Sequence, residues 1–249
     1  MKDLLQLFER RRSIRKFRDE AIPEDLIIQI IETGQRAPTA GELYSVIWVR
    51  DKMQKESLPY QRKNAEILVV CADFKRLQYL LKTQNEEMME MESWLFLWGL
   101  LDAGLFMQNM IMAAEALGQG SVILGGIAVE MKKVCKVLKI PKYVIPVAGL
   151  AIGYPAESPP IRPRLNYHHV LHIDSYQETV IENLIDDIKR IDISRRNEHY
   201  YEKYGKRNDD TDYDCLKHII MKYSERNVKP EKINEYKQIL RDQLDINLV

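Results

Sequence analysis

The stretch SWLFLWGLLDAGLFMQNMIMAAEALG, residues 93–118, is apolar enough to suggest a membrane span. Four polar residues interrupt it: Asp102, Gln108, Asn109 and Glu115. Charges at membrane depth are costly. A helix that is apolar nearly all round and flanked by charges is typical of the buried central helix of a soluble protein. Gly118 supplies a suitable C-terminal stop, so we expect a buried helix over residues 93–118.

The segments on either side of this helix predict a mixture of strands and helices. AEILVVCAD, residues 65–73, is a nearly continuous apolar and β-branched run, which predicts a strand buried on both faces. Further strands are expected within residues 45–50, 118–127 and 144–155, and helices over 3–10, between Pro23 and Pro38, and over 130–140 with Pro141 as its stop. Residues 51–64 suggest a charged connection and 75–92 a polar segment. A proline-rich arm follows Ser158, and beyond residue 175 the pattern is charged and helical.

The composition limits the class of protein. A chain of 249 residues forms one large domain or two small ones, and a hydrophobic content of 45% supports a substantial core. Cys71, Cys135 and Cys215 are scattered and form no CxxC pair, which argues against a disulfide framework or a zinc site. The first residues run from apolar to basic, opposite to the order of a signal peptide. We therefore expect a soluble, cytoplasmic protein.

A basic cluster, RRSIRKF at residues 11–17, stands in an otherwise neutral chain. Lys+Arg and Asp+Glu both number 37, which argues against a nucleic-acid surface. Two interpretations stay open on composition alone: a solvated basic face, or a site for one small anion. Arginine suits an anion site because its planar fork donates two hydrogen bonds to a phosphate. Ser13 adds a neutral hydroxyl donor.

Three other short segments could join the cluster around one ligand. They are the small-residue loop PTAG at 38–41, the glycine pair at 125–126, and the basic arm RPR at 162–164. The glycine pair fits a tight turn and close approach to a flat ligand equally well. The chain has no P-loop, no GxGxxG fingerprint after a strand and no Ser-His-Asp arrangement readable from spacing. The combination suggests a ligand with a phosphate at one end and a planar body at the other.

In their order along the chain, these segments resemble the motifs of the flavin-dependent nitroreductase family. RRSIRKF is similar to its opening motif, RAPTAGELYSVIWVR to its loop and strand, DAGLFMQNMIMAAEALGQGSVILGGI to its central helix and glycine turn, and AGLAIGYPAESPPIRPRL to its last strand and basic arm. The match covers about residues 7–176. It looks most like the branch of oxygen-insensitive NAD(P)H nitroreductases and flavin reductases with long C-termini.

The resemblance implies an α+β fold: a mixed, mainly antiparallel sheet wrapped by helices, in an intertwined homodimer. Residues 93–118 would form much of the dimer core, and each FMN would lie at the subunit interface. Residues 1–175 would form the FMN-binding domain. Residues 176–249 would form a helical extension that packs on the body or on the partner subunit.

The same resemblance implies roles for individual residues. Arg11, Ser13 and Arg164 match positions that hold the FMN phosphate, and Arg12 lies within the same motif. Arg15 and Arg162 match basic positions near the pyrimidine edge of the flavin, where positive charge favours the anionic reduced form. The residues whose backbone would line the ring are Thr39, Ala40, Leu124, Gly125 and Gly126. Gln61 matches a glutamine that reaches the flavin from the other subunit.

The implied reaction is ping-pong electron transfer from NADH or NADPH to a small acceptor. The nicotinamide donates hydride to the flavin and leaves, and a nitroaromatic, a quinone or free flavin then takes two electrons. The scheme requires no side-chain acid or base, and no metal. Two alternatives stay open: an FMN-binding protein with a sensing or storage role and little turnover, and a generic α+β binding module without flavin.

The chain departs from the family pattern at three places. Arg162 stands where many relatives have lysine, which keeps the charge. Glu42 follows the PTAG loop where much of the family has asparagine, and we expect it to face solvent. The tail YEKYGKRNDDTDYD, residues 201–214, lacks the arginines with which close relatives grip the 2′-phosphate of NADPH. We therefore expect weak preference for NADPH, or comparable use of NADH.

Overall fold

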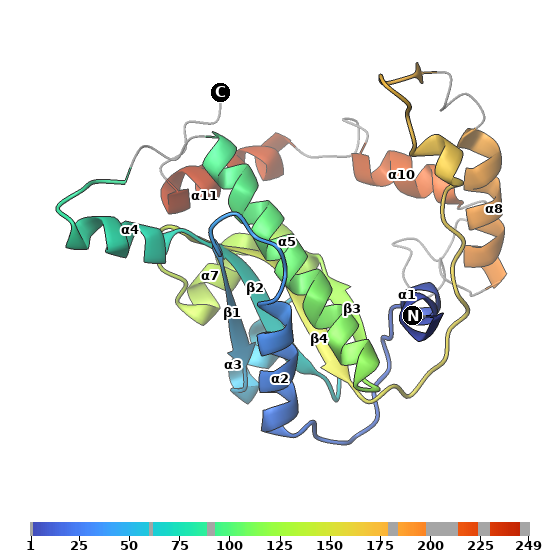
Figure 1. The fold of residues 1–249 in the computed structure, drawn as a ribbon, viewed down its shortest axis with the longest axis horizontal. Helices are drawn as coiled ribbons and strands as arrows, with labels where there is room; N and C mark the ends of the chain where they lie inside the picture. Colours follow the sequence, from blue (N-terminus) through green and yellow to red (C-terminus); the bar gives the residue numbers. More distant parts are fainter. Residues whose placement is uncertain are drawn as a thin grey trace. The chain divides into compact units, whose positions relative to one another are not determined.

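The computed structural model describes residues 2–59, 62–88, 93–178, 184–197, 214–223 and 230–244. The chain forms two compact units. The first comprises Met1–Ser158 together with Asn234–Val249, and the second comprises Pro159–Ile233. Figure 1 labels the helices and strands of both units.

The first unit is built on a four-stranded sheet (Figure 1). Its strands are β1 (Tyr44–Val49), β2 (Glu66–Asp73), β3 (Gly120–Leu124) and β4 (Val144–Gly153), in the order β1-β2-β4-β3. All three strand pairs are antiparallel. In the register, Val70 of β2 lies opposite Val46 of β1 and Ala148 of β4. A parallel bridge between Ser13 and Ser121 adds the N-terminal segment to the edge of β3.

The central strand β2 is buried on both faces, as its continuous apolar sequence predicts. Alternate side chains of a strand point to opposite faces of the sheet. Leu68 and Val70 pack in a cluster with side chains of the helix α5 (Ser93–Ala116). Ile67, Val69 and Cys71 pack in a second cluster with side chains of the helix α7 (Met131–Leu138). A strand covered on both sides has no solvent-facing position for polar residues, which explains why the alternation is missing from its sequence.

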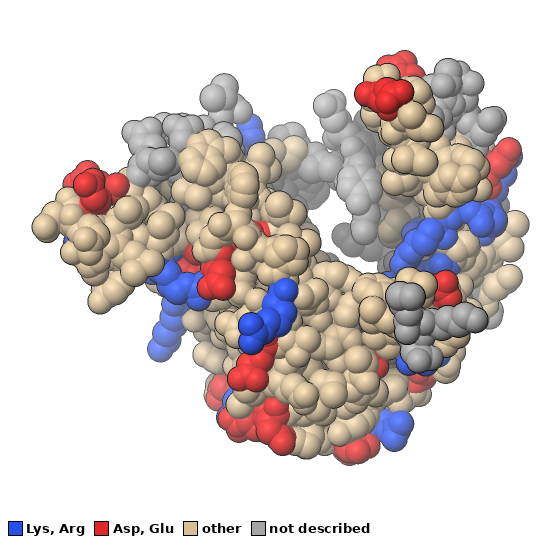
Figure 2. All heavy atoms as spheres, viewed as in Figure 1, with Lys and Arg blue, Asp and Glu red and all other residues tan. Residues whose placement is uncertain are grey.

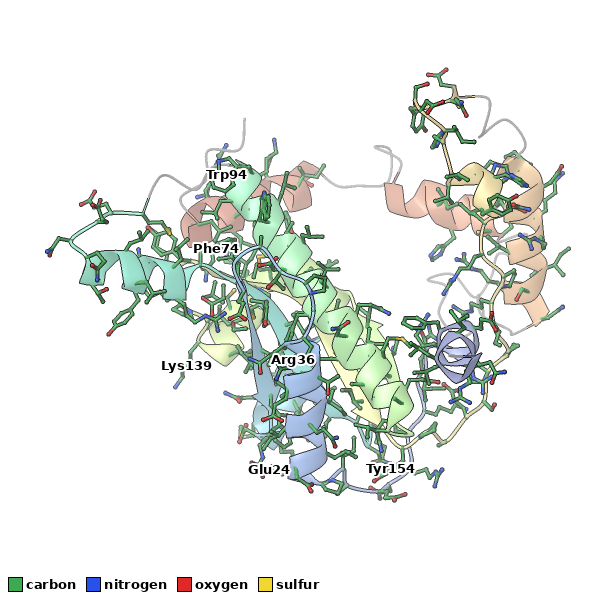
Figure 3. All side chains as sticks on the ribbon, viewed as in Figure 1. Glu24, Arg36, Phe74, Trp94, Lys139 and Tyr154 are labelled. Carbon is green, nitrogen blue, oxygen red and sulfur yellow. The ribbon has the colours of Figure 1, made fainter. Side chains whose placement is uncertain are left out.

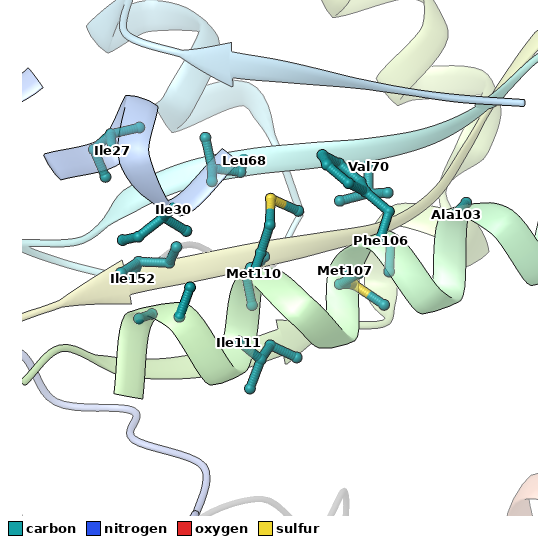
Figure 4. Packing of buried hydrophobic residues seen from close by; sticks show 14 of the residues in the cluster. Ile27, Ile30, Leu68, Val70, Ala103, Phe106, Met107, Met110, Ile111 and Ile152 are labelled. Carbon is teal, nitrogen blue, oxygen red and sulfur yellow. The ribbon is translucent and has the colours of Figure 1, made fainter. Parts of the chain in front are cut away.

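The helix α5 (Ser93–Ala116) lies across one face of the sheet beside α2 (Glu24–Gly34). Figure 4 shows Phe106 and Met110 of α5 packed among side chains of α2 and the sheet. Gly34 permits this close approach, because a Cβ there would lie 2.5 Å from Cγ of Met110. At the other end of α5, Phe74 is fully buried beside the helix (Figure 3).

Among the described residues, one helix, Trp94–Ala116, is long and apolar enough to cross a membrane by length and composition alone. The buried central helix of a soluble protein passes the same test. Asp102, in the middle of this helix, is fully buried and hydrogen-bonded to a loop of the same unit. One face of α5 therefore packs in the core, as the sequence predicts, whereas Trp94, Leu97, Trp98 and Leu101 on another face are exposed.

Several short helices complete the first unit. They are α1 (Lys2–Arg10), α3 (Lys52–Ser57), α4 (Lys75–Thr83), α6 (Gly126–Val129) and α7 (Met131–Leu138). The sequence interpretation of residues 51–64 as a plain connection and of 75–92 as a polar segment was wrong where α3 and α4 form. The Asp51 carboxylate caps α3 by accepting the Gln54 N–H at 2.8 Å. The helix α7 ends earlier than Pro141, because Lys139 adopts a left-handed φ of 52°.

The C-terminal helix α11 (Pro230–Leu244) packs largely on the first unit. Its Leu240 and Leu244 are buried in a cluster with Phe74 and Leu95. The second unit contains a 3-10 turn, η1 (Tyr167–His169), and the helices α8 (Leu184–Asn197) and α10 (Cys215–Tyr223). This division differs from the one expected at residue 175, since the basic arm groups with α8 and the end of α11 groups with the sheet.

Candidate binding site

The segment after α1 is fixed to the edge of the sheet by its backbone. The Ile14 N–H donates to the Ser121 carbonyl at 2.9 Å, and the Arg18 N–H donates to the Tyr154 carbonyl at 2.9 Å. Two glycines make room for it: a Cβ at Gly120 or Gly153 would lie 2.6 Å from a side-chain atom of Ile14 or Phe17, respectively. The arginine cluster therefore has a defined position beside β3 and β4.

A carboxylate and a hydroxyl from the segment after β4 contact this cluster. Oε1 of Glu157 accepts the backbone N–H of Arg15 at 2.6 Å and that of Lys16 at 3.2 Å. Nη2 of Arg12 donates to Oγ of Ser158 at 2.9 Å. The side chain of Lys16 is exposed, as expected.

A second acid, Glu115 of α5, lies in the field of the same cluster. Burial raises the pKa of the Glu115 carboxyl, and the positive charges of Arg10, Arg11 and Arg12 partly oppose that rise. Arg11 and Arg12 are only partly exposed. These contacts argue against the alternative of a fully solvated basic face. Figure 2 shows basic and acidic side chains side by side over the described part of one face, in keeping with the zero net charge.

Asp102 holds the small-residue loop between α2 and β1 through hydrogen bonds to the loop backbone. The Asp102 carboxylate accepts the N–H groups of Ala40, Gly41 and Leu43 at 2.8, 3.1 and 3.0 Å. Such charge-assisted bonds to backbone N–H groups are stronger than neutral ones. The sequence reasoning treated Asp102 only as a polar interruption of the helix. Its signal was available, because an acid within an apolar buried helix must find donors.

The outer side of this loop is open. Thr39 is partly buried and Ala40 is exposed. The Ala40 N–H is already bonded to Asp102, which leaves the carbonyl and the methyl group of Ala40 available. Glu42 is exposed, as expected, and has a left-handed φ of 50°.

The glycine turn after β3 also has open space. Leu124 is buried, whereas Gly125 is exposed with an ordinary helical φ of −63°. Apart from its two chain neighbours, no described residue would come within 4 Å of a Cβ on Gly125. Neither a left-handed turn nor crowding requires glycine there, which favours the alternative of close approach by a ligand. Gly126 begins α6.

The basic arm belongs to the second unit. Arg162 is partly buried and Arg164 is exposed. Within the part of the chain that the structure describes, the Arg164 guanidinium makes no hydrogen bond or ion pair. Its carbonyl, in contrast, accepts a hydrogen bond from Nη2 of Arg190 at 2.8 Å.

The structure places Ala40 and Leu124 in different hollows of the first unit. Ala40 lines a cavity of about 520 Å³ whose other walls include Arg76, Leu77, Trp94 and Trp98. Leu124 lines a cavity of about 440 Å³ whose other walls include Lys55, Leu58, Pro59, Arg62 and Ile127. Gln61 lies outside the described residues, and so does nearly all of the tail segment 201–214.

Other catalytic chemistry finds little support in the described residues. No group of three or more His, Cys, Asp or Glu side chains among them could hold a metal ion. Burial raises the pKa of the Cys135 thiol to about 11, and it also raises that of Cys71. Both are protonated at neutral pH and are poor nucleophiles, because the thiolate is the reactive form.

Three comparisons with known proteins give consistent results. The model described as "Nitroreductase family" matches residues 8–154. The FMN reductase (NADPH) of Bacillus subtilis (strain 168) is 36% identical over 187 residues, which cover 71% of this chain and 75% of that protein. The structure of B. megaterium NfrA1 has a TM-score of 0.80 at 29% identity and covers 97% of this chain and 98% of its own. The Vibrio harveyi NADPH:FMN oxidoreductase complexed with NAD+ has a TM-score of 0.77 at 26% identity and covers 95% and 97%.

Proposed function

The chain belongs to the nitroreductase family, and on that basis we propose that it is an FMN-dependent oxidoreductase that uses NADH or NADPH as electron donor. The observation that carries this proposal is the family match over residues 8–154, which includes the arginine cluster, the PTAG loop and the glycine turn. It agrees with the activities for which the B. subtilis and V. harveyi relatives are named. The nitroreductase-like α+β fold expected from the sequence is confirmed by the solved structures.

The described residues fit FMN. Arg164 has an exposed guanidinium without a described partner, which suits a phosphate, and Arg11 and Ser13 offer further donors on a fixed segment. The open space at Gly125 suits a flat ring near the backbone. FMN supplies the redox chemistry when bound, and the protein supplies position and electrostatics.

We assign the remaining residues of the site by their chemistry. The charges of Arg15 and Arg162 would favour an anionic reduced flavin. Asp102 would keep Thr39 and Ala40 in a fixed arrangement against the ring, because it anchors the loop that carries them. Arg12 would support the cluster through its bond to Ser158. A contact from Gln61 to the flavin of the partner subunit stays a prediction.

We further propose that the protein is a homodimer. Trp94, Leu97, Trp98 and Leu101 recur at the spacing of one helix face, and each has between 47% and 62% of its surface exposed. A row of large apolar side chains on the surface of a soluble protein marks an interaction site. This row runs along α5, the helix that the family resemblance places in the dimer core.

The acceptors proposed are small molecules, namely nitroaromatics, quinones or free flavin. We place the enzyme in the cytoplasm, a compartment that suits its three free cysteines. A sensing or storage protein would also bind FMN but would turn over slowly.

Anaerobic reduction of the purified protein tests the proposal. We expect a yellow protein with about one FMN per chain, whose colour bleaches within minutes of adding NADH or NADPH and returns with a quinone or nitroaromatic acceptor. A colourless protein that does not take up added FMN would overturn the proposal. A yellow protein that neither donor bleaches would favour the storage alternative.

A further inference from the structure

The arm that carries Arg162 and Arg164 has little backbone structure of its own. Among the described residues, no backbone-to-backbone hydrogen bond begins or ends within 159–165. Pro159, Pro160 and Pro163 contribute no N–H group at all. An extended segment of this kind is free to sample many positions unless other groups hold it.

Two side chains of α8 hold the arm at the position of Arg164. The Asp187 carboxylate accepts the backbone N–H of Asn166 through Oδ2. Nη2 of Arg190 donates both to the Arg164 carbonyl at 2.8 Å and to Oδ1 of Asp187 at 3.0 Å. Nε2 of His169 lies 3.5 Å from Oδ2 of Asp187. One acid and one arginine, paired with each other, therefore fix a carbonyl and an N–H two residues apart.

These contacts leave the Arg164 side chain unused. Its backbone is fixed by Arg190, whereas its guanidinium is exposed and has no hydrogen bond or ion pair with a described residue. An arginine whose main chain is held and whose side chain is free is prepared to bind an anion, because less freedom is lost on binding.

We propose that Asp187 and Arg190 form a clasp that positions Arg164 for the phosphate of FMN. Asp187 and Arg190 act as positioning residues, since they contact the arm and act on the ligand only through it. The inference rests on the proposed function, because it takes FMN as the ligand of Arg164. It adds a role for two residues of the helical region beyond residue 175, which the family motifs do not include.

The neighbouring pair on the same helix provides a matched control. Asp186 and Lys189 also lie three residues apart and are 3.4 Å from each other, but 82% and 68% of their side chains are exposed. The Asp187 side chain is only 14% exposed. An exposed pair of this kind contributes little by itself. If Asp187 acted only as a surface charge, replacing Asp186 would change the affinity for FMN as much as replacing Asp187.

The experiment measures the affinity of the full-length apoprotein for FMN and for riboflavin, which lacks the phosphate, by flavin fluorescence. The variants are Asp187→Ala, Asp187→Asn, Asp186→Ala, Arg164→Ala and the double variant of Asp187 and Arg164. We expect Asp187→Ala to raise the Kd for FMN about fivefold to thirtyfold, because binding must then order the backbone of about one residue of the arm. The Kd for riboflavin should not change, and Asp186→Ala should match the wild type.

The double variant separates positioning from a general structural effect. If Asp187 acts through Arg164, removing Asp187 has no further effect on FMN affinity once Arg164 is alanine. Three results would overturn the clasp. The first is that Asp187→Ala weakens FMN binding equally in the wild-type and Arg164→Ala backgrounds. The others are that it weakens riboflavin binding as much as FMN binding, or that it leaves FMN affinity unchanged. Should Asp187→Ala not fold, Asp187→Asn carries the same comparison, since it removes the charge and keeps one acceptor.

Failure of the proposed function has a different signature. A wild-type protein that binds neither flavin, or an Arg164→Ala variant with wild-type FMN affinity, would overturn the assignment of Arg164 and the clasp with it. If Arg164→Ala weakens FMN binding as expected but Asp187→Ala does not, only the clasp is overturned and the assignment of Arg164 stands.

Discussion

Two carboxylates hold two proposed ligand-binding segments by their backbone, and they do so in different surroundings. Asp102 of the first unit is fully buried and accepts three N–H groups of the PTAG loop region. The Asp187 side chain of the second unit is largely covered, but the residues that it contacts, Asn166 and Arg190, are exposed, and it accepts the backbone N–H of Asn166. Water can replace the bonds of Asp187 but not those of Asp102. Asp102 therefore links its loop to the stability of the whole unit, whereas Asp187 governs only local order.

The largest effect is expected from Asp102→Ala. The change leaves three backbone N–H groups without their acceptor, one of them in the buried Leu43. We expect the free energy of unfolding to fall by about 3 kcal/mol, as for other buried charged hydrogen-bond networks. Urea denaturation of Asp102→Ala beside Asp186→Ala measures this, and the second variant should stay within about 0.5 kcal/mol of the wild type. A loss below about 1 kcal/mol in Asp102→Ala would mean that the loop is not coupled to the core.

A smaller effect, confined to the ligand, is expected from Arg164→Ala. A charge-assisted hydrogen bond contributes about 1.5–3 kcal/mol, which corresponds to roughly tenfold to a hundredfold in the Kd for FMN. The free energy of unfolding should stay the same, because the Arg164 guanidinium has no partner among the described residues. Lys16→Ala is the control within the arginine cluster, since Lys16 is exposed and only its backbone is held. Equal FMN affinities in flavin titrations of the two variants would show that the phosphate lies elsewhere.

The sequence predicted the parts of the fold that depend on local pattern. The unbroken apolar run of β2 requires burial on both faces, and the structure confirms it. The apolar run of residues 93–118 correctly predicted a long helix packed on the sheet, whereas burial of its second apolar side against a partner subunit stays a prediction. The helices α3 and α4 were missed because they are short, with no buried residue in either of them. Their formation depends on caps and neighbours and not on a hydrophobic stripe.

The sequence motifs predicted the residues of the candidate site, but they did not predict the residues that hold those segments in place. Arg11, Ser13 and Gly125 stand in recognisable patterns, whereas Asp102 acts on residues about sixty positions away and Glu157 on residues more than a hundred and forty away. Such pairs are set by the tertiary fold. The proposed roles of Asp187 and Arg190 depend on contacts with residues more than twenty positions away, which no local pattern indicates.

Two glycines of the first unit differ in the same way: Gly120 is required by the packing of the fold, whereas Gly125 has open space beside it. A Cβ at Gly120 would overlap Ile14, so Gly120→Ala should lower the free energy of unfolding by about 1–3 kcal/mol. Gly125 has space and a helical φ, so Gly125→Ala should stay within about 0.5 kcal/mol of the wild type. It should instead weaken FMN binding. Wild-type FMN affinity in Gly125→Ala would remove the reason for placing the ring there.

The smallest effect concerns the ionisation of Asp187. The hydrogen bond from the Asn166 N–H lowers the pKa of the Asp187 carboxyl below the ordinary 3.8, and the charges of Arg190 and His169 act in the same direction. A folded-state pKa below the unfolded value means that folding favours the charged form. The stabilisation from the clasp is therefore complete above the unfolded pKa and is lost as the pH falls through the folded one.

A pair of substitutions at Asn166 isolates the main cause of this shift. Asn166→Ala and Asn166→Pro both remove the side chain, but only proline removes the N–H, and the Asn166 φ of −62° already suits proline. Carboxyl-carbon NMR titration should therefore give Asp187 a higher pKa in the proline variant than in the alanine variant. The remaining contact between the Asp187 carboxylate and the arm, through Arg190, should be lost at a correspondingly higher pH in the proline variant. Equal pKa values in the two variants would show that Asp187 is held by Arg190 alone, and that its bond to the arm backbone has no part in the clasp.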